Sequence, residues 1–214
     1  MKVLDLFSGL GGFSQAFKDR GHSVTTYDND SDFHADWICD IGDLIQLPIV
    51  DVILASPPCD CFSMMSLAKY WNKDNTSKNE IAEQSLGLVK HALKLIEESH
   101  PTFWVLENPR AKLRKLIGLP QMTVTWCQYG AKVQKMTDLW GNIPLSFQPR
   151  KCRNGDSCHI PAPRGSRTGT QNDLSSAERA KIPYGLSLEL CLAMESEISI
   201  MHTQLKDAST PEKR

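Results

Sequence analysis

Residues 3–13 read VLDLFSGLGGF, an apolar segment that leads directly into three glycines. The apolar residues predict a buried strand, and Phe13, Ala16 and Phe17 follow at the spacing of an amphipathic helix. Glycines at such a turn let the backbone approach a ligand closely, at the positive end of a helix. The spacing is G-x-G-G, which differs from the G-x-G-x-x-G dinucleotide fingerprint. Taken alone, the segment fits a ligand turn and an ordinary tight turn equally well.

A second predicted strand ends on an acidic residue, Asp28, about 20 residues further along, the offset expected for a ribose-binding acid. A carboxylate at the end of that strand suits two ribose hydroxyls. Because the dinucleotide fingerprint is missing, the glycine turn and Asp28 together predict a nucleoside cofactor that need not be a dinucleotide.

Strand and helix patterns alternate along most of the chain. The predicted strands are 2–7, 23–28, 50–55, 102–107, 122–127 and 137–142, and the predicted helices are 12–20, 79–99 and 110–117. This alternation favours an α/β fold with a doubly wound, mostly parallel sheet. Apolar residues are few in 144–173, which predicts an irregular insert, and helical composition returns in 174–202.

Residues 55–63 read ASPPCDCFS and follow the predicted strand 50–55. Two prolines cannot continue a central strand, so the chain turns and presents Cys59 at the strand's carboxyl end. Ligands of open α/β sheets bind at that end, so the thiol is placed like a nucleophile. The alternative is a buried, inert cysteine.

Composition limits the class of protein. The chain has 214 residues and a net charge of −1, which fits one domain and gives no overall basic signature of nucleic-acid binding. Basic residues gather in 109–115 and 148–181, where they either contact nucleic acid or form a solvated surface. Seven cysteines, an odd number, and an opening core strand predict a cytoplasmic protein with reduced thiols and no membrane association.

Three motifs occur in a set order: residues 5–12, then Pro58-Cys59 with Phe62-Ser63, then Glu107-Asn108. In this order they resemble the cytosine-C5 DNA methyltransferase family, over roughly the first two thirds of the chain. The resemblance implies a Rossmann-like methyltransferase fold, S-adenosylmethionine as cofactor, and double-stranded DNA as the partner. It implies methyl transfer to C5 of cytosine through a covalent cysteine adduct, in restriction-modification or viral modification.

The resemblance also assigns residue roles. Cys59 would be the covalent nucleophile, Glu107 the acid toward the base, and Asn108 the residue that holds the Cys59 loop. The cofactor residues would be Phe7, Gly9, Gly11, Asp28, Asp40, Ile41 and Pro58. The substrate residues would be Ser63, Gln134, Lys135, Arg150, Arg164 and Arg167.

Two departures from the family concern the substrate. Met136 and Asp138 stand where the family has two arginines that place the base, so Lys132, Lys135 or Thr137 is left for that role. The family also reads sequence with a separate recognition domain, whereas only the basic insert 144–173 is available here. We therefore expect a catalytic domain over 1–143, this insert, a helical segment 174–202 packed on the catalytic domain, and a disordered tail 203–214. We also expect loose sequence specificity, or a partner chain that reads sequence.

The insert contains Cys152, Cys158 and His159, which could hold zinc. Only these three ligands are local, and Cys127 or Cys191 could complete the set only if the fold brought it close. The spacing is unlike that of the usual zinc motifs, so the sequence favours free loop cysteines and no metal.

Three other functions compete with C5 methylation of DNA. Ser56-Pro57-Pro58 imitates the signature of amino methyltransferases, but Cys59 cannot stack a base as the aromatic residue of that signature would. C5 methylation of RNA or of a cytidine nucleotide uses the same chemistry. A non-catalytic, nucleic-acid-binding partner of a methyltransferase would fit the missing arginines but leaves Cys59 and Glu107 without a role.

Overall fold

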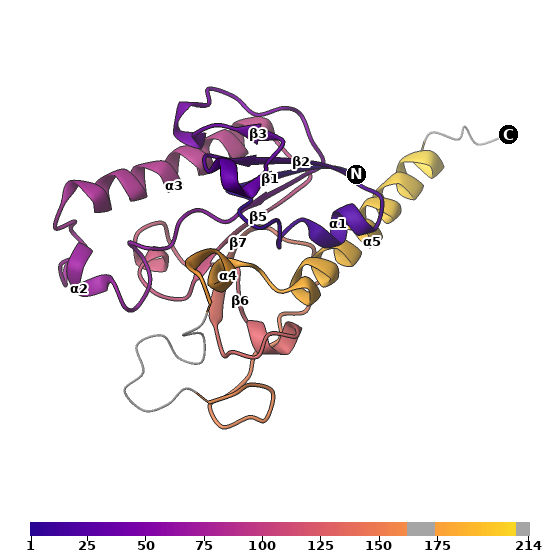
Figure 1. Ribbon diagram of the computed structural model, residues 1–214. Helices are drawn as coiled ribbons and strands as arrows, with labels where there is room; N and C mark the ends of the chain where they lie inside the picture. Colours follow the sequence, from indigo (N-terminus) through magenta and orange to yellow (C-terminus); the bar gives the residue numbers. More distant parts are fainter. Residues whose placement is uncertain (162–173, 209–214) are drawn as a thin grey trace, which may run out of the picture.

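The computed structural model describes residues 1–161 and 174–208 of the chain, and its centre is one seven-stranded sheet in the order β3-β2-β1-β4-β5-β7-β6 (Figure 1). Strands β1 to β5 pair in parallel, whereas β7 runs antiparallel to both β5 and β6. The sheet confirms the predicted α/β fold with a doubly wound, mostly parallel sheet. The strands are β1 (Lys2–Leu6), β2 (Ser23–Asp28), β3 (Trp37–Ile38), β4 (Val52–Ala55), β5 (Phe103–Pro109), β6 (Met122–Thr125) and β7 (Met136–Asn142).

Helices cover both faces of the sheet. Figure 1 shows α3 on one side and α1 with α5 on the other. The helices are α1 (Gln15–Asp19), α2 (Leu67–Tyr70), α3 (Glu80–Ser99), α4 (Ser176–Ala180) and α5 (Tyr184–Ala208). Four short 3-10 turns are η1 (Ser31–Phe33), η2 (Ile41–Asp43), η3 (Leu113–Lys115) and η4 (Trp126–Tyr129).

The two-sided packing explains why β4, a central strand, is apolar at every position. In β4, Val52 and Leu54 face the α1 and α5 layer, while Ile53 and Ala55 face the α3 layer, and all four are fully buried. Helix α3 buries a stripe at helical spacing, made of Ala82, Val89, Ala92, Leu95 and Ile96.

The Ser187 hydroxyl of helix α5 contacts the backbone at the start of helix α1. Ser187 Oγ donates a hydrogen bond to the Phe13 carbonyl at 2.6 Å and accepts one from the Ala16 N–H at 3.2 Å. Gly185 lies against the backbone of Tyr129, where a Cβ would come within 2.6 Å of the carbonyl oxygen. These contacts hold the C-terminal helix beside the glycine turn.

Several predicted boundaries differ from the structure. The helix predicted over 110–117 is only the turn η3, because β5 extends to Pro109 and Gly118, at φ +99°, ends the segment. The helix predicted from residue 12 begins at Gln15, after the glycine turn. The tail expected to be disordered from residue 203 is helical as far as Ala208, and 209–214 lie outside the described residues.

Residues 144–161 of the predicted insert contain no helix or strand. Among the helices within 1–161 and 174–208, none has an apolar run long enough to cross a membrane.

Candidate active site

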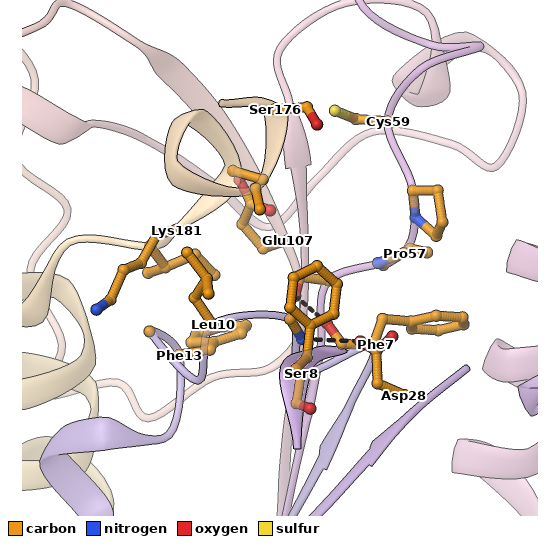
Figure 2. Close-up of a pocket in the computed structure, with 18 of the residues that line it drawn as sticks. Phe7, Ser8, Leu10, Phe13, Asp28, Pro57, Cys59, Glu107, Ser176 and Lys181 are labelled. Atoms are coloured by element: carbon orange, nitrogen blue, oxygen red, sulfur yellow. Dashed lines mark hydrogen bonds between the residues drawn. The ribbon is translucent and has the colours of Figure 1, made fainter. Parts of the chain in front are cut away.

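A cavity of about 300 Å³ opens at the carboxyl ends of four parallel strands. Its lining includes Phe7 after β1, Asp28 at the end of β2, Cys59 after β4 and Glu107 in β5. Figure 2 shows Phe7 and Asp28 at one end of the cavity, Cys59 at the other, and Glu107 between them. The sheet thus brings together residues that the sequence separates by up to 100 positions, at the edge where ligands of such folds bind.

The glycine turn forms one wall of the cavity. Phe7 has φ +59°, an uncommon conformation for a bulky residue, and Gly9 follows at φ +49°. Two hydrogen bonds hold this backbone: Ser56 Oγ donates to the Phe7 carbonyl at 3.1 Å, and the Gly9 N–H donates to Asp28 Oδ2 at 2.8 Å. Strained non-glycine residues concentrate at functional sites, and here the strained residue is one that lines the cavity.

Asp28 is buried, and its two oxygens accept backbone N–H groups from Gly9 and Asp30, the second at 3.0 Å. A carboxylate oxygen has two lone pairs, so each oxygen keeps the capacity to accept a further hydrogen bond from a ligand. Asp28 therefore both shapes the glycine turn and offers acceptors to the cavity.

The Cys59 loop is held by short backbone contacts. The N–H groups of Phe62 and Ser63 donate to the Cys59 carbonyl at 2.9 and 3.0 Å, and Asn108 Nδ2 donates to the Pro57 carbonyl at 3.0 Å. Burial raises the pKa of the half-buried Cys59 thiol, and the positive charge of Lys135 opposes that rise. The loop is therefore fixed on both sides of the thiol.

Glu107 is buried in β5, and its Oε1 has no hydrogen-bond partner among the described residues. Burial raises the pKa of this carboxyl above its ordinary value, while Lys135 lowers it. Lys135 is itself fixed, since its Nζ lies 3.6 Å from the centre of the Trp126 ring and donates to the Arg179 carbonyl at 3.2 Å. A carboxyl whose pKa is raised holds its proton to higher pH than an ordinary glutamate, which suits it to donating a proton to a ligand.

Several predicted residues lie outside the cavity lining. Asp40 caps η2 through the Gly42 N–H, and Ile41 is in the core under α3. Asn108 also lies outside the lining, and its side-chain amide donates to the Pro57 carbonyl of the Cys59 loop. The remaining predicted residues that lie outside this lining are Gly11, Ser63, Gln134 and Arg150, while Arg164 and Arg167 fall outside the described residues.

Two of these residues are engaged elsewhere. Gln134 Nε2 donates to Cys152 Sγ at 3.2 Å, which turns the amide toward the insert. The Arg150 guanidinium binds the Glu189 carboxylate and lies over the Tyr129 ring, 4.6 Å from its centre. Lys135 is the only residue of the predicted substrate set that lines the cavity in the described part of the chain.

The structure explains one departure from the family pattern. Asp138 is fully buried and forms a two-pronged ion pair with Arg114, at 2.8 and 2.6 Å, and also accepts from Thr123 Oγ1 at 2.8 Å. Position 138 thus anchors β7 to the segment after β5 and does not line the cavity.

Helix α4 contributes a wall that the sequence did not indicate. Ser176, Ala177 and Ala180, followed by Lys181 and Ile182, line the cavity, and Figure 2 shows Ser176 beside Cys59. The available signal was the Ser175-x-x-Glu178 capping box, which the structure contains in full. That signal locates a helix start, but it does not say where the helix packs.

Comparison with known proteins identifies the family. A sequence profile described as C-5 cytosine-specific DNA methylase matches residues 1–115, more than half of the chain. The chain belongs to this family. The match confirms the resemblance carried by the three ordered motifs, because it spans the glycine turn, Cys59 and Glu107.

Individual relatives of this methylase family differ in how much of the chain they match. A protein of frog virus 3, named "Probable DNA (cytosine-5)-methyltransferase", is 31% identical over 167 residues, which cover 74% of this chain and 78% of its own length. The type II methyltransferase M.AgeI of Thalassovita gelatinovora is 28% identical over 130 residues, which cover 50% of this chain and 28% of its own length.

Among solved structures, the Entamoeba histolytica methyltransferase EhMeth matches with a TM-score of 0.47 and 15% identity, over 72% of this chain and 57% of that chain. The Dnmt2 methyltransferase of S. pombe matches with a TM-score of 0.43 and 14% identity, over 70% of this chain and 52% of that one. The chain thus spans just over half the length of these two structures.

Proposed function

We propose that this protein transfers a methyl group from S-adenosylmethionine to C5 of cytosine in DNA, through a covalent adduct on Cys59. The observation that carries the proposal is that one cavity holds a half-buried thiol and a buried, unpartnered carboxyl oxygen together with the glycine turn and Asp28. Family membership supports the same reaction class.

The Phe7 and Asp28 end of the cavity fits a nucleoside cofactor. A volume of about 300 Å³ lies at the lower limit of small-molecule sites. Asp28 keeps free lone pairs for ribose hydroxyls. The glycine turn offers Phe7 and Gly9 as further contacts, and the Cys59 loop offers Pro58. When bound there, S-adenosylmethionine supplies an electrophilic methyl group.

Cys59 and Glu107 would act on the base at the other end. The Cys59 thiolate adds to C6 of cytosine, and Glu107 gives a proton to N3, so that electron density moves to C5. The pKa of Glu107, raised by burial, favours its protonated form, and the positive charge of Lys135 favours the thiolate of Cys59. Asn108 is a positioning residue, because its amide holds the Pro57 carbonyl of the same loop.

The DNA side of the proposal is carried by Lys135 and by the basic insert. Lys135 lines the cavity, and its positive charge acts on the pKa of both Cys59 and Glu107. Residues 144–173 stand where the family has a recognition domain, and phosphate contacts from their arginines would give affinity without sequence information. A partner chain for recognition remains part of the proposal.

The test is methyl transfer from labelled S-adenosylmethionine to duplex DNA, single-stranded DNA, RNA and cytidine nucleotide, followed by nucleoside analysis. The expected product is 5-methylcytosine in DNA, with no product from Cys59→Ser. Label in N4-methylcytosine or N6-methyladenine would show that the protein is an amino methyltransferase and would contradict the C5 mechanism. Label confined to RNA or nucleotide would keep the chemistry and change the substrate.

A further inference from the structure

Four metal-binding side chains meet at one point away from the active-site cavity. Cys127 comes from η4, whereas Cys152, Cys158 and His159 come from the insert. Their ligand atoms all lie within 4.8 Å of one another. The fold therefore supplies the fourth ligand that the insert alone does not have.

The spacing of these atoms fits a tetrahedral site. Zinc–sulfur and zinc–nitrogen bond lengths of about 2.3 and 2.05 Å place two sulfurs about 3.8 Å apart and a sulfur and a nitrogen about 3.6 Å apart. His159 Nδ1 lies 3.8 Å from Cys152 Sγ and 3.5 Å from Cys158 Sγ. Cys127 Sγ lies 3.1 Å from Cys152 Sγ and 3.5 Å from Cys158 Sγ. A small adjustment of the sulfurs would complete the tetrahedron.

The cluster is buried, which free loop cysteines would not require. Cys127, Cys152 and His159 are 7%, 9% and 8% exposed, and Cys158 is half-buried. Burying three thiols and an imidazole against one another leaves weak hydrogen bonds as their only mutual stabilisation. A metal ion would convert these contacts into coordinate bonds.

Two side-chain amides surround the sulfurs. Gln134 Nε2 donates to Cys152 Sγ at 3.2 Å, and Gln128 Nε2 donates to Cys158 Sγ at 3.3 Å. N–H donors around thiolate ligands offset their negative charge and orient them, as the outer shell of a metal site does. The donors therefore fit sulfur in its metal-binding form.

The insert backbone is arranged to present its ligands. The Thr125 N–H donates to the Arg150 carbonyl at 3.0 Å, and the Ile160 N–H donates to the Lys132 carbonyl at 2.9 Å. Between these two anchors, Gly155 at φ +95° allows the chain to reverse and return Cys158 to Cys152.

We propose that Cys127, Cys152, Cys158 and His159 bind one Zn²⁺ ion that fastens the insert to the catalytic domain. Three thiolates and one imidazole are a structural zinc set, and soft sulfur ligands in a tetrahedron disfavour magnesium or calcium. Binding releases the thiol protons and leaves a site with one net negative charge. The proposal departs from the sequence-based expectation of free loop cysteines.

The zinc site would also stabilise the segment 126–135, which carries Lys135 of the active-site cavity. Gln134, which contacts a ligand sulfur, precedes Lys135, and Trp126, on which the Lys135 ammonium rests, precedes Cys127. Zinc at this position would fix both ends of the segment 126–135. Loss of the zinc should therefore make Lys135 more mobile and leave the cofactor end of the cavity unchanged.

The experiment measures metal content and ligand type in the full-length chain, purified under reducing conditions with zinc present. We expect about one zinc per chain by mass spectrometry of the metal, and an X-ray absorption spectrum with three sulfurs and one nitrogen. Cys127→Ser and Cys158→Ser should lose the zinc, while Cys39→Ser, a half-buried cysteine outside the cluster, should keep it.

A second measurement applies even if those variants do not fold. Cobalt added to the reduced, metal-free wild type should give sulfur-to-cobalt charge-transfer absorption that zinc abolishes, and a chelator should lower the melting temperature of the zinc-loaded protein. Zinc well below one per chain with no such absorption would overturn the proposal. A Cys127–Cys152 disulfide in the freshly isolated protein, or zinc retained by folded Cys158→Ser, would overturn it as well.

Discussion

Asp5 provides a prediction about stability that follows from its burial. This residue of β1 is fully buried, Ser14 Oγ donates to its Oδ2 at 2.6 Å, and its Oδ1 has no partner among the described residues. Burial raises the pKa of Asp5 from 3.8 to about 7. The folded protein therefore keeps a proton on Asp5 over a pH range in which the unfolded chain has released it.

The sign and size of the effect follow from linkage. Between pH 3.8 and about 7 the folded state binds more protons than the unfolded state, so the free energy of unfolding falls as pH rises. The contribution of Asp5 to the free energy of unfolding is fully present below pH 3.8 and is lost above about pH 7. At about 1.36 kcal/mol per pKa unit, this interval corresponds to roughly 4 kcal/mol.

The perturbation is Asp5→Asn, which resembles the protonated carboxyl and does not titrate. We expect the variant to match the wild type at pH 3.8 within about 1 kcal/mol and to be more stable at pH 8 by about 4 kcal/mol. Urea unfolding across this pH range measures the difference, with exposed Asp32→Asn as the matched control. Glu107 contributes a slope of the same sign, so Glu107→Gln is measured separately. A pH slope that is identical in the wild type and Asp5→Asn would refute the reasoning.

Three further predictions concern the cofactor end, the β7 anchor and specificity. Asp28→Ala should weaken S-adenosylmethionine binding by about 1–3 kcal/mol in calorimetry, and an unchanged affinity would remove Asp28 from the site. Arg114→Met should destabilise the fold by about 3–5 kcal/mol in urea unfolding, because it leaves the buried Asp138 carboxylate unpaired, while a loss below 1 kcal/mol would contradict that account. Methylation of a long duplex should be salt-sensitive, tolerant of flanking sequence and stronger at mismatched or single-stranded targets, and bisulfite sequencing that finds one motif of four or more base pairs would show sequence reading.

The sequence was sufficient to predict the site residues that lie at or just after the carboxyl ends of strands. Cys59 and Glu107 each follow an apolar run, and parallel neighbouring strands bring their carboxyl ends to one edge of the sheet. The glycine turn and Asp28 reach the same edge through the β1–β2 pair. A pattern of alternating elements was therefore sufficient to place them in one cavity.

Other parts depend on tertiary contacts that no local pattern encodes. Asp40 caps η2 and does not line the cavity, whereas α4, which follows the insert in the sequence, does line it. Cys127 and Cys152 are 25 residues apart. Strand β7 runs away from η4, and the insert returns to η4 after it, where the Thr125 N–H donates to the Arg150 carbonyl. Sequence spacing around Cys152 could not reveal that contact.

The covalent role of Cys59 is tested most directly with a duplex that contains 5-fluorocytosine. The fluorine cannot leave as the C5 proton would, so the wild-type protein with S-adenosylmethionine should form a complex that survives denaturation, with the adduct on the Cys59 peptide by mass spectrometry. Cys61→Ser, two residues away, should still be trapped, while Cys59→Ser should not. Methylation of normal cytosine by a wild-type protein that forms no adduct with the fluorinated duplex would contradict the account.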